Sequence, residues 1–291
     1  MASATQVAVS GTEISYAGPF LKWAGGKGQL LTKLTPFFPA TFNRYFEPFM
    51  GSAAVFFSLR RTLGEFPAIL MDANAELVNC FKIVKAKPDD LIPLLRQHQT
   101  THDAKTYYKI RGQSPGDLSE LRRAARFIYL NKTCYNGLYR VNASGKFNVP
   151  VGSYKNPRIF DRDALLAAST ALKGAHISRG DFSATRDLAT KGDFLYFDPP
   201  YYSDGSGFTG YAVAASGKAL FGAEEHLRLC CVAERLARVG CHVIVSNSDT
   251  EFIRQIYKKA GFRISAVTAR RFINCNGDGR SPVSELVITS S

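Results

Sequence analysis

The feature of this sequence with the clearest chemical meaning is the run Asp198-Pro199-Pro200-Tyr201, which follows an apolar stretch at residues 194–197. Such a stretch predicts a short buried strand that delivers a carboxylate, two prolines and an aromatic ring to one edge of a sheet. The prolines have no backbone N–H, so the turn presents only acceptors. Asp198 and the Pro199 carbonyl can each accept one N–H bond from an exocyclic amine, which makes the nitrogen more nucleophilic. With Tyr201 as a stacking surface, the run predicts methylation of the amino group of an extruded nucleobase.

Two other predicted strands also end in carboxylates, Glu47 after residues 44–46 and Asp72 after residues 68–71. In a doubly wound sheet, ligands bind beyond the carboxyl ends of the strands. Asp72 comes 21 positions after Gly51, close to the spacing of about 20 residues that separates a glycine turn from an acid holding ribose hydroxyls. The acids together predict a nucleoside-containing cofactor at that edge, although helix capping or solvent exposure would also account for either one alone.

Strand and helix patterns alternate in the first and last thirds of the chain, and residues 74–161 interrupt them with helical patterns. Strands are predicted at 44–47, 68–72, 193–197, 242–247, 262–268 and 285–289, and helices at 53–61 (capped by Ser52), 224–239 and 251–260. The expected fold class is α/β, a doubly wound Rossmann-like sheet with an inserted, mostly helical domain that contains a β-hairpin. Residues 1–73 and 162–291 would form the sheet domain, and residues 74–161 the inserted domain.

Positive charge is concentrated in the middle of the chain. The net charge is +13, and residues 105–180 alone contain 14 basic and four acidic residues. This uneven distribution favours a dedicated surface for a polyanionic partner over general solubility. The predicted hairpin in this segment has arms at 139–142 and 146–149 about Gly145, and it carries Arg140. We therefore expect the middle segment to bind nucleic acid.

The remaining composition excludes several other classes of protein. The six cysteines form no C-x-x-C pair and have no histidine cluster beside them, so a structural zinc site is not expected. This cysteine usage is typical of a reduced, cytoplasmic protein. The sequence has no signal-peptide pattern and no apolar run near 18 residues, so we expect no membrane span. We also expect no metal, because the cysteines and histidines form no cluster of ligands.

Several longer motifs resemble, in order, those of the Dam-type DNA adenine-N6 methyltransferases. They are Phe20-Leu21-Lys22-Trp23-Ala24-Gly25-Gly26-Lys27, Phe46-Glu47-Pro48-Phe49-Met50-Gly51, Leu130-Asn131-Lys132 with Asn136-Gly137-Leu138-Tyr139-Arg140, Phe147-Asn148-Val149-Pro150 and Asp198-Pro199-Pro200-Tyr201. Ser246-Asn247 with Asp249-Thr250, and Arg270-Arg271 with Arg280, extend the resemblance to about residues 20–288. The resemblance implies a methyltransferase fold that uses S-adenosyl-L-methionine to methylate adenine N6 in double-stranded DNA, with the GATC-specific members closest.

The resemblance also implies roles for individual residues. The catalytic residues would be Asp198, Pro199, Pro200 and Tyr201. The cofactor-binding residues would be Trp23, Lys27, Glu47, Gly51, Asp72 (on the ribose), Asp181 (on the cofactor adenine), Phe182 and Asp198. The DNA-recognition residues would be Lys22, Asn136, Leu138, Arg140 and Pro150. The sequence departs from the family at Ala53, where a second glycine is common and where alanine is small enough to keep the turn.

Arg140 also has a physical case of its own. An arginine on a hairpin can donate two N–H bonds to guanine O6 and N7, which is worth ~1–3 kcal/mol of discrimination between bases. A phosphate contact is the alternative for this residue. The segment 203–217, rich in glycine and serine, is expected to close over the extruded base.

Other functions stay open on the sequence alone. An N4-cytosine methyltransferase would use the same geometry, although that class often has serine in place of Asp198. An adenine methyltransferase acting on RNA would read the same base edge, and a catalytically silent DNA-binding protein could keep the scaffold. The silent protein is disfavoured by four intact residues, Trp23, Lys27, Asp72 and Asp198. The lack of G-x-G-x-x-G excludes a dinucleotide-dependent oxidoreductase. We expect a monomer that acts either alone or beside a restriction endonuclease.

Overall fold

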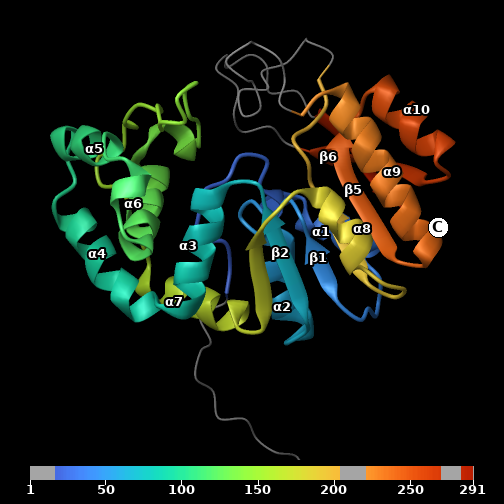
Figure 1. The fold of residues 1–291 in the computed structure, drawn as a ribbon, viewed down its shortest axis with the longest axis horizontal. Coiled ribbons are helices and arrows are strands. Elements are labelled where there is room, and N and C mark those ends of the chain that lie inside the picture. The colour runs from blue at the N-terminus through green and yellow to red at the C-terminus, as the bar shows by residue number, and fades with distance from the viewer. Residues whose placement is uncertain (1–16, 204–220, 270–282, 291) are drawn as a thin grey trace, which may run out of the picture.

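The computed structural model describes residues 17–203, 221–269 and 283–290. Within these residues, seven strands form one sheet in the order β3-β2-β1-β4-β5-β7-β6 (Figure 1). The strands are β1 (Tyr45–Glu47), β2 (Ala68–Asp72), β3 (Ala175–Arg179), β4 (Phe194–Phe197), β5 (His242–Ser248), β6 (Arg263–Ala269) and β7 (Val283–Thr289). Strands β1 to β5 are parallel, and β7 is antiparallel to both β5 and β6. The doubly wound α/β sheet predicted from the sequence is therefore confirmed.

All six predicted strands are present, with ends shifted by at most two residues. Strand β3 was not predicted. Its buried Ala175 and Ile177 alternate with exposed His176 and Arg179, a short and polar pattern. It forms a strand because all five of its residues pair with β2, a contact with a part of the chain about 100 residues away.

The central strand β4 is buried on both faces, as is typical of a parallel strand between two helical layers. Phe194 and Tyr196 belong to the core on one face, and Leu195 and Phe197 belong to the core on the other. The first layer contains α2 (Ala54–Leu63), α3 (Ala75–Ala86) and α7 (Arg162–Leu172), and the second contains α9 (Ala223–Val239) and α10 (Glu251–Lys259). Two short helices, α1 (Leu31–Leu34) and α8 (Thr185–Leu188), complete the sheet region.

The two predicted helices near the carboxyl terminus are confirmed. Helix α9 ends at Gly240, which has a φ of +92°, and Gly261, with a φ of +80°, follows α10. These left-handed positions favour glycine, which explains why the sequence changes from helix to strand there.

Helix α2 begins differently from the prediction. Its N-cap is Ala53 rather than Ser52, and the N-cap side chain itself makes no capping hydrogen bond. Ala53 has φ 53° and ψ 37°, a left-handed conformation that costs a non-glycine residue about 1–2 kcal/mol. Glycine adopts this conformation freely, so the alanine introduces backbone strain that a glycine would avoid.

Ala53→Gly should therefore leave the free energy of unfolding unchanged or raise it by up to about 1 kcal/mol, because relief of strain offsets the lost methyl group. The matched control is Ala54→Gly in the first turn of α2, which should lower the free energy of unfolding by about 1 kcal/mol. Urea denaturation measures both variants. An equal loss in the free energy of unfolding for the two variants would show that the backbone at Ala53 is unstrained.

The middle segment is mostly helical, as predicted, with α4 (Pro88–Thr100), α5 (Ala104–Arg111) and α6 (Glu120–Thr133) grouped at one end of the molecule (Figure 1). Helix α3 contacts α6 on one side and strands β2 and β3 on the other. The predicted hairpin is a turn closed by one β-bridge, Val141–Phe147, rather than by two strands. Gly145 takes the predicted positive φ of +74°.

Candidate active site

Two of the predicted acids meet where the order of the strands reverses. From β1 the chain builds outward through β2 and β3, whereas β4 lies on the other side of β1 and is followed by β5. Glu47 ends β1 and Asp198 follows β4, and these two strands are direct neighbours. In open α/β sheets, ligands bind at this switch point, beyond the carboxyl ends of the strands.

Asp198 forms an ion pair with Lys27. Lys27 Nζ lies 2.7 Å from Asp198 Oδ1, and the two side chains are only 4% and 19% exposed. Lys27 Nζ also donates to the Gly25 carbonyl at 2.8 Å. Burial raises the pKa of the Asp198 carboxyl, and the neighbouring Lys27 ammonium opposes that rise. The glycine turn that precedes Lys27 thus holds its cation beside the carboxylate.

The turn after Asp198 is anchored from two strands. The Tyr201 hydroxyl donates to Glu285 Oε2 at 2.8 Å, and Lys27 Nζ lies 4.8 Å from the centroid of the Tyr201 ring. The next residue, Tyr202, donates its N–H to Asn247 Oδ1 at 3.1 Å and accepts from Ser248 Oγ at 2.6 Å. The Ser246-Asn247 motif singled out in the sequence therefore supports the backbone that follows Pro-Pro-Tyr.

Glu47 is buried beneath this site, 3% exposed. Its Oε2 accepts from the Tyr45 hydroxyl at 2.8 Å and from the Phe56 N–H, in the first turn of α2, at 3.1 Å. Burial raises the pKa of the Glu47 carboxyl from about 4.5 to about 8, although these two hydrogen bonds oppose the rise. Glu47 therefore caps α2 as well as lying at the switch point.

This pKa predicts a pH-dependent stability. Between about pH 4.5 and 8 the folded protein holds a proton on Glu47 that the unfolded chain releases. As the pH rises through this range, the free energy of unfolding therefore falls by up to ~1.4 kcal/mol per pH unit. Glu47→Gln keeps an acceptor for Phe56 and does not titrate. The variant should therefore gain stability relative to the wild type as the pH rises from about 5 to about 8. Urea denaturation at several pH values tests this, and a pH-independent difference between the two proteins would contradict it.

Asp72, Gly51 and Trp23 form a second part of the same edge. Asp72 Oδ2 accepts from the Gly51 N–H at 3.2 Å, and its Oδ1 accepts from the Asn74 N–H at 2.9 Å. A Cβ added to Gly51, which has a φ of +47°, would lie 2.7 Å from Trp23 Cδ1. The glycine is required here both by its backbone conformation and by the closeness of the indole.

Gly51→Ala should therefore displace Trp23. On the role predicted for this turn from the sequence, it should also weaken binding of S-adenosyl-L-methionine by at least about tenfold, or 1.4 kcal/mol. The matched control is Gly145→Ala. Gly145 also has a positive φ, but a Cβ added there would meet no atom within 4 Å. That variant should show only the backbone cost of about 1 kcal/mol in stability. Calorimetric titration with the cofactor separates the two, and wild-type affinity in Gly51→Ala would refute the role of this turn.

Asp181 and Phe182 lie beside Asp72, since the Gly180 N–H donates to the Asp72 carbonyl at 3.2 Å. The Asp181 carboxylate is bound by the Arg228 guanidinium through two bonds of 2.7 and 2.9 Å, which hold the pKa of Asp181 well below its usual range. Phe182 is 2% exposed, stacks on Phe49 and lies under Arg228 at 4.2 Å. Asp181 is thus at the surface of this edge, whereas Phe182 is part of its core.

The predicted DNA-recognition residues gather around the turn that follows α6. The Lys22 N–H and carbonyl both bond the Asn131 side chain, and Gly137 lies directly against the Lys22 side chain. The Pro150 carbonyl accepts from the Tyr135 N–H at 2.9 Å, which joins the two ends of the hairpin region. The other predicted residues lie within this turn and hairpin: exposed Asn136 with φ 54°, half-buried Leu138, and exposed Arg140.

Trp23 connects this group to the sheet edge. Its ring stacks on Tyr139 at 6.0 Å and on Phe127 at 6.3 Å, and it also lies against Gly51. Lys22 is the preceding residue in the chain, so one short segment contacts both the predicted cofactor residues and the predicted DNA-reading residues.

The sequence did not single out Glu285 or Arg228. Glu285 is 84 residues from its partner Tyr201, and Arg228 is 47 residues from its partner Asp181. No local sequence pattern marks either contact. The predicted closing segment after Ser203 and the arginines at 270, 271 and 280 fall outside the described residues.

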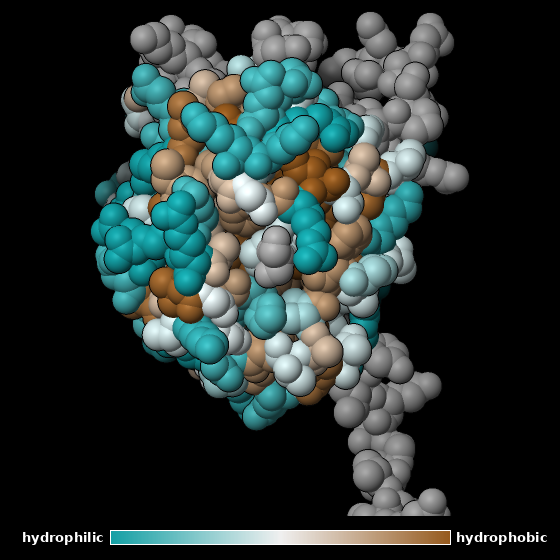
Figure 2. Space-filling view, turned by 90° about the vertical axis from the view of Figure 1, so that its right-hand side faces the viewer, coloured by the Kyte–Doolittle hydropathy of each residue, from teal (hydrophilic) through white to brown (hydrophobic). Residues whose placement is uncertain are grey.

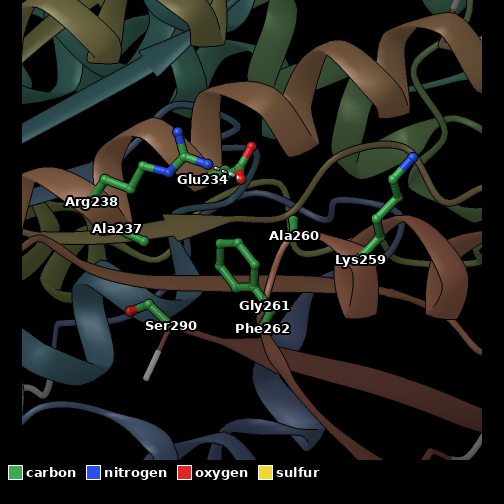
Figure 3. Close-up of a pocket in the computed structure, with 8 residues that line it drawn as sticks. All are labelled: Glu234, Ala237, Arg238, Lys259, Ala260, Gly261, Phe262 and Ser290. Carbon is green, nitrogen blue, oxygen red and sulfur yellow. Dashed lines mark hydrogen bonds and ion pairs between the residues drawn. The ribbon is translucent and has the colours of Figure 1, made fainter.

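A separate hollow lies at the opposite edge of the sheet (Figure 3), lined by Glu234, Ala237, Arg238, Lys259, Ala260, Gly261, Phe262 and Ser290. Ser290 follows β7 at the amino end of β5, away from the carboxyl ends where Asp198 lies. Figure 2 shows the side of the molecule that lies on the right in Figure 1, where α9 and α10 are found and where hydrophilic and hydrophobic residues are interspersed. Within the described ranges, no group of three His, Cys, Asp or Glu residues could hold a metal ion. No described helix is long and apolar enough to cross a membrane.

Comparison with known proteins identifies the class to which this sheet and its Asp-Pro-Pro-Tyr turn belong. A sequence profile described as "D12 class N6 adenine-specific DNA methyltransferase" matches residues 23–273. The protein is thus an α/β methyltransferase. More narrowly, the chain belongs to the D12 class of N6 adenine-specific DNA methyltransferases, and it is an enzyme that methylates adenine N6 in DNA.

Individual relatives agree with this assignment. The chain is 40% identical to the Type II methyltransferase M.MjaIII of Methanocaldococcus jannaschii over 289 residues, which cover 93% of this chain and 98% of the relative. It is 36% identical to a DNA adenine methylase of Haemophilus influenzae, with 92% of each chain covered. A solved precorrin-6y C5,15-methyltransferase from Geobacter metallireducens has a TM-score of 0.36 at 9% identity, covering 89% of this chain and 85% of that one. That last similarity is too weak to add to the fold assignment.

Proposed function

We propose that the enzyme transfers a methyl group from S-adenosyl-L-methionine to N6 of an adenine extruded from double-stranded DNA, within the sequence GATC. The observation that carries this proposal is the ion pair at the switch point. Lys27 Nζ lies 2.7 Å from the Asp198 carboxylate and 4.8 Å from the Tyr201 ring centroid. A carboxylate, a carbonyl from Pro199 and an aromatic face are thus close together at the edge where α/β sheets bind ligands.

The chemistry of this edge fits S-adenosyl-L-methionine. The methionine end of the cofactor carries an ammonium and a carboxylate, whose charges match Asp198 and Lys27 respectively. Its ribose carries two hydroxyls, and the half-buried Asp72 carboxylate is held in place to accept from them. Gly51 lets the backbone approach closely beside Trp23, and we assign Asp181 and Phe182 to the adenine end. When bound, the cofactor supplies an electrophilic methyl group.

The residues of the turn prepare the adenine for attack. The Asp198 carboxylate accepts one N–H bond of the target amine and the Pro199 carbonyl accepts the other. Tyr201 stacks on the extruded base, which recovers part of the few kcal/mol that extrusion costs. Because burial raises the pKa of Asp198, its carboxylate is also suited to receive the proton that the amine releases after methylation. Alignment and exclusion of water supply most of the rate.

The inserted segment 74–161 binds the duplex and reads its sequence. Its positive charge supplies the affinity for phosphates, and the residues around the hairpin, Lys22, Asn136, Leu138, Arg140 and Pro150, contact the bases. We propose a monomeric, cytoplasmic enzyme, which shares that compartment with its DNA and with the reducing conditions that suit its free cysteines.

Expression in cells that lack adenine methylation tests the proposal. Genomic DNA and total RNA from these cells are both mapped for N6-methyladenine and its flanking bases. The expected result is methylation of adenine in GATC in DNA alone. Methylation confined to RNA would overturn the choice of substrate, and methyladenine in another sequence would overturn the recognition site while leaving the chemistry intact.

A further inference from the structure

The hydrogen bond between Tyr201 and Glu285 is not explained by any of the assigned roles. The Tyr201 hydroxyl donates to Glu285 Oε2 at 2.8 Å, and both side chains are half-buried. Glu285 comes from β7, where it pairs with Ser248 of β5 and Val267 of β6. A carboxylate held in the middle of three strands is a rigid acceptor, so the bond fixes the position of the hydroxyl.

A second contact constrains the same ring in a different way. Lys27 Nζ lies over one face of the Tyr201 ring, 4.8 Å from its centroid. The ammonium is itself fixed by Asp198 Oδ1 at 2.7 Å and the Gly25 carbonyl at 2.8 Å. A cation over an aromatic face is an attractive contact, stronger where water is excluded. The cation therefore favours one tilt of the ring.

The two contacts act on different torsions of the tyrosine side chain. The hydroxyl lies on the axis of χ2, so the bond to Glu285 sets the direction of the ring through χ1 and leaves the ring free to spin. The cation above the face resists that spin and sets χ2. With one face covered by Lys27, only the opposite face of Tyr201 can receive a planar base.

We propose that Glu285 is a positioning residue that, together with Lys27, orients the Tyr201 ring so that its face away from Lys27 stacks on the extruded adenine. This inference rests on the proposed function of Tyr201. It adds a residue that does not touch the substrate and that lies 84 positions further along the chain. A misplaced ring would hold fewer bases in the reactive geometry, so its loss affects the rate of methyl transfer more than DNA binding.

Four variants test this role: Tyr201→Phe, Glu285→Ala, their double variant, and Glu285→Gln, which keeps an acceptor for the hydroxyl. The expected result is a tenfold lower single-turnover rate for each of the first two, with the dissociation constants for cofactor and duplex DNA changed less than threefold. The double variant should be no slower than the slower single variant, because both remove the same bond. Glu285→Gln should stay within threefold of the wild-type rate.

The matched control is Tyr196→Phe, which also loses a tyrosine hydroxyl, bonded at 2.7 Å to Ser246 Oγ inside the sheet. It should keep the wild-type rate. A duplex with 2-aminopurine at the target adenine provides a spectroscopic readout, since its fluorescence reports stacking of the extruded base. Tyr201→Phe and Glu285→Ala should change that signal alike, whereas Tyr196→Phe should not.

Wild-type rates in Tyr201→Phe and Glu285→Ala would overturn the positioning role while leaving the proposed function in place. The same holds if the fold-loss of rate in the double variant equals the product of the two single losses. An unchanged rate in Tyr201→Ala would instead refute the stacking role of Tyr201 itself. Tyr201→Phe removes the bond without altering β7, so the test holds even where Glu285→Ala does not fold.

Discussion

Asp198→Ala should abolish adenine methylation, with a loss in kcat of at least roughly 10²–10³, the effect of removing one preorganised polar group at a reacting centre. In the proposed mechanism the carboxylate is the acceptor that makes the amine nucleophilic. It is also the partner that holds Lys27 beside Tyr201. Single-turnover assays with a GATC duplex measure the rate, and titrations of cofactor and duplex measure binding. Duplex DNA should still bind, because the proposal assigns the phosphate contacts to the inserted segment rather than to this turn.

The matched control is Asp193→Ala, at the other end of the same strand. Asp193 is fully buried and paired with Arg44 at 2.6 Å, so its loss also leaves a cation without its carboxylate. Each variant is expected to lose stability, since breaking a buried pair costs about 3–5 kcal/mol. The loss at Asp193 should be smaller, because Arg44 is 35% exposed and water can solvate its charge. Only Asp198→Ala should lose kcat once folding is verified by circular dichroism. Substantial methylation by that variant would overturn the role of the carboxylate.

Arg140→Ala should relax sequence preference more than it weakens binding. The Arg140 Nε donates to Asn148 Oδ1 at 2.8 Å across the hairpin, which orients a guanidinium that has further N–H donors for a base. Loss of two bonds to guanine should reduce discrimination against single-base variants of GATC by ~1–3 kcal/mol, or roughly 5–150-fold. Competition assays between GATC and altered duplexes measure this ratio.

Lys146→Ala is the control on the same hairpin, since Lys146 is exposed and its charge favours phosphate contacts. It should weaken binding to all duplexes alike and reduce the slope of log affinity against log salt by about one. A uniform loss of affinity in Arg140→Ala, with discrimination intact, would assign that residue to the phosphate backbone instead.

Features with a local cause could be predicted from the sequence. Strand β4 and the turn at Asp198 were predicted because a buried parallel strand is continuously apolar and two prolines end it. The ends of α9 and α10 were predicted because Gly240 and Gly261 take left-handed conformations. The concentration of positive charge likewise indicated a nucleic-acid partner before any geometry was known.

Features that depend on distant contacts could not be predicted in the same way. Strand β3 is short and polar, and only pairing with β2 makes it a strand. The bond between Tyr201 and Glu285 joins two elements 84 residues apart. The start of α2 was predicted to within one residue, but Ala53 as a left-handed N-cap was not, because this conformation usually favours glycine.

The central claim is that Asp198 and the Pro199 carbonyl bind the amino group of an extruded adenine. A crystal structure with a GATC duplex and a non-reactive analogue of the cofactor tests it most directly. The account predicts a flipped adenine whose N6 lies within hydrogen-bonding distance of both acceptors, stacked on the face of Tyr201 away from Lys27. A target adenine that stays stacked in the duplex, or an N6 bound by other groups, would contradict it.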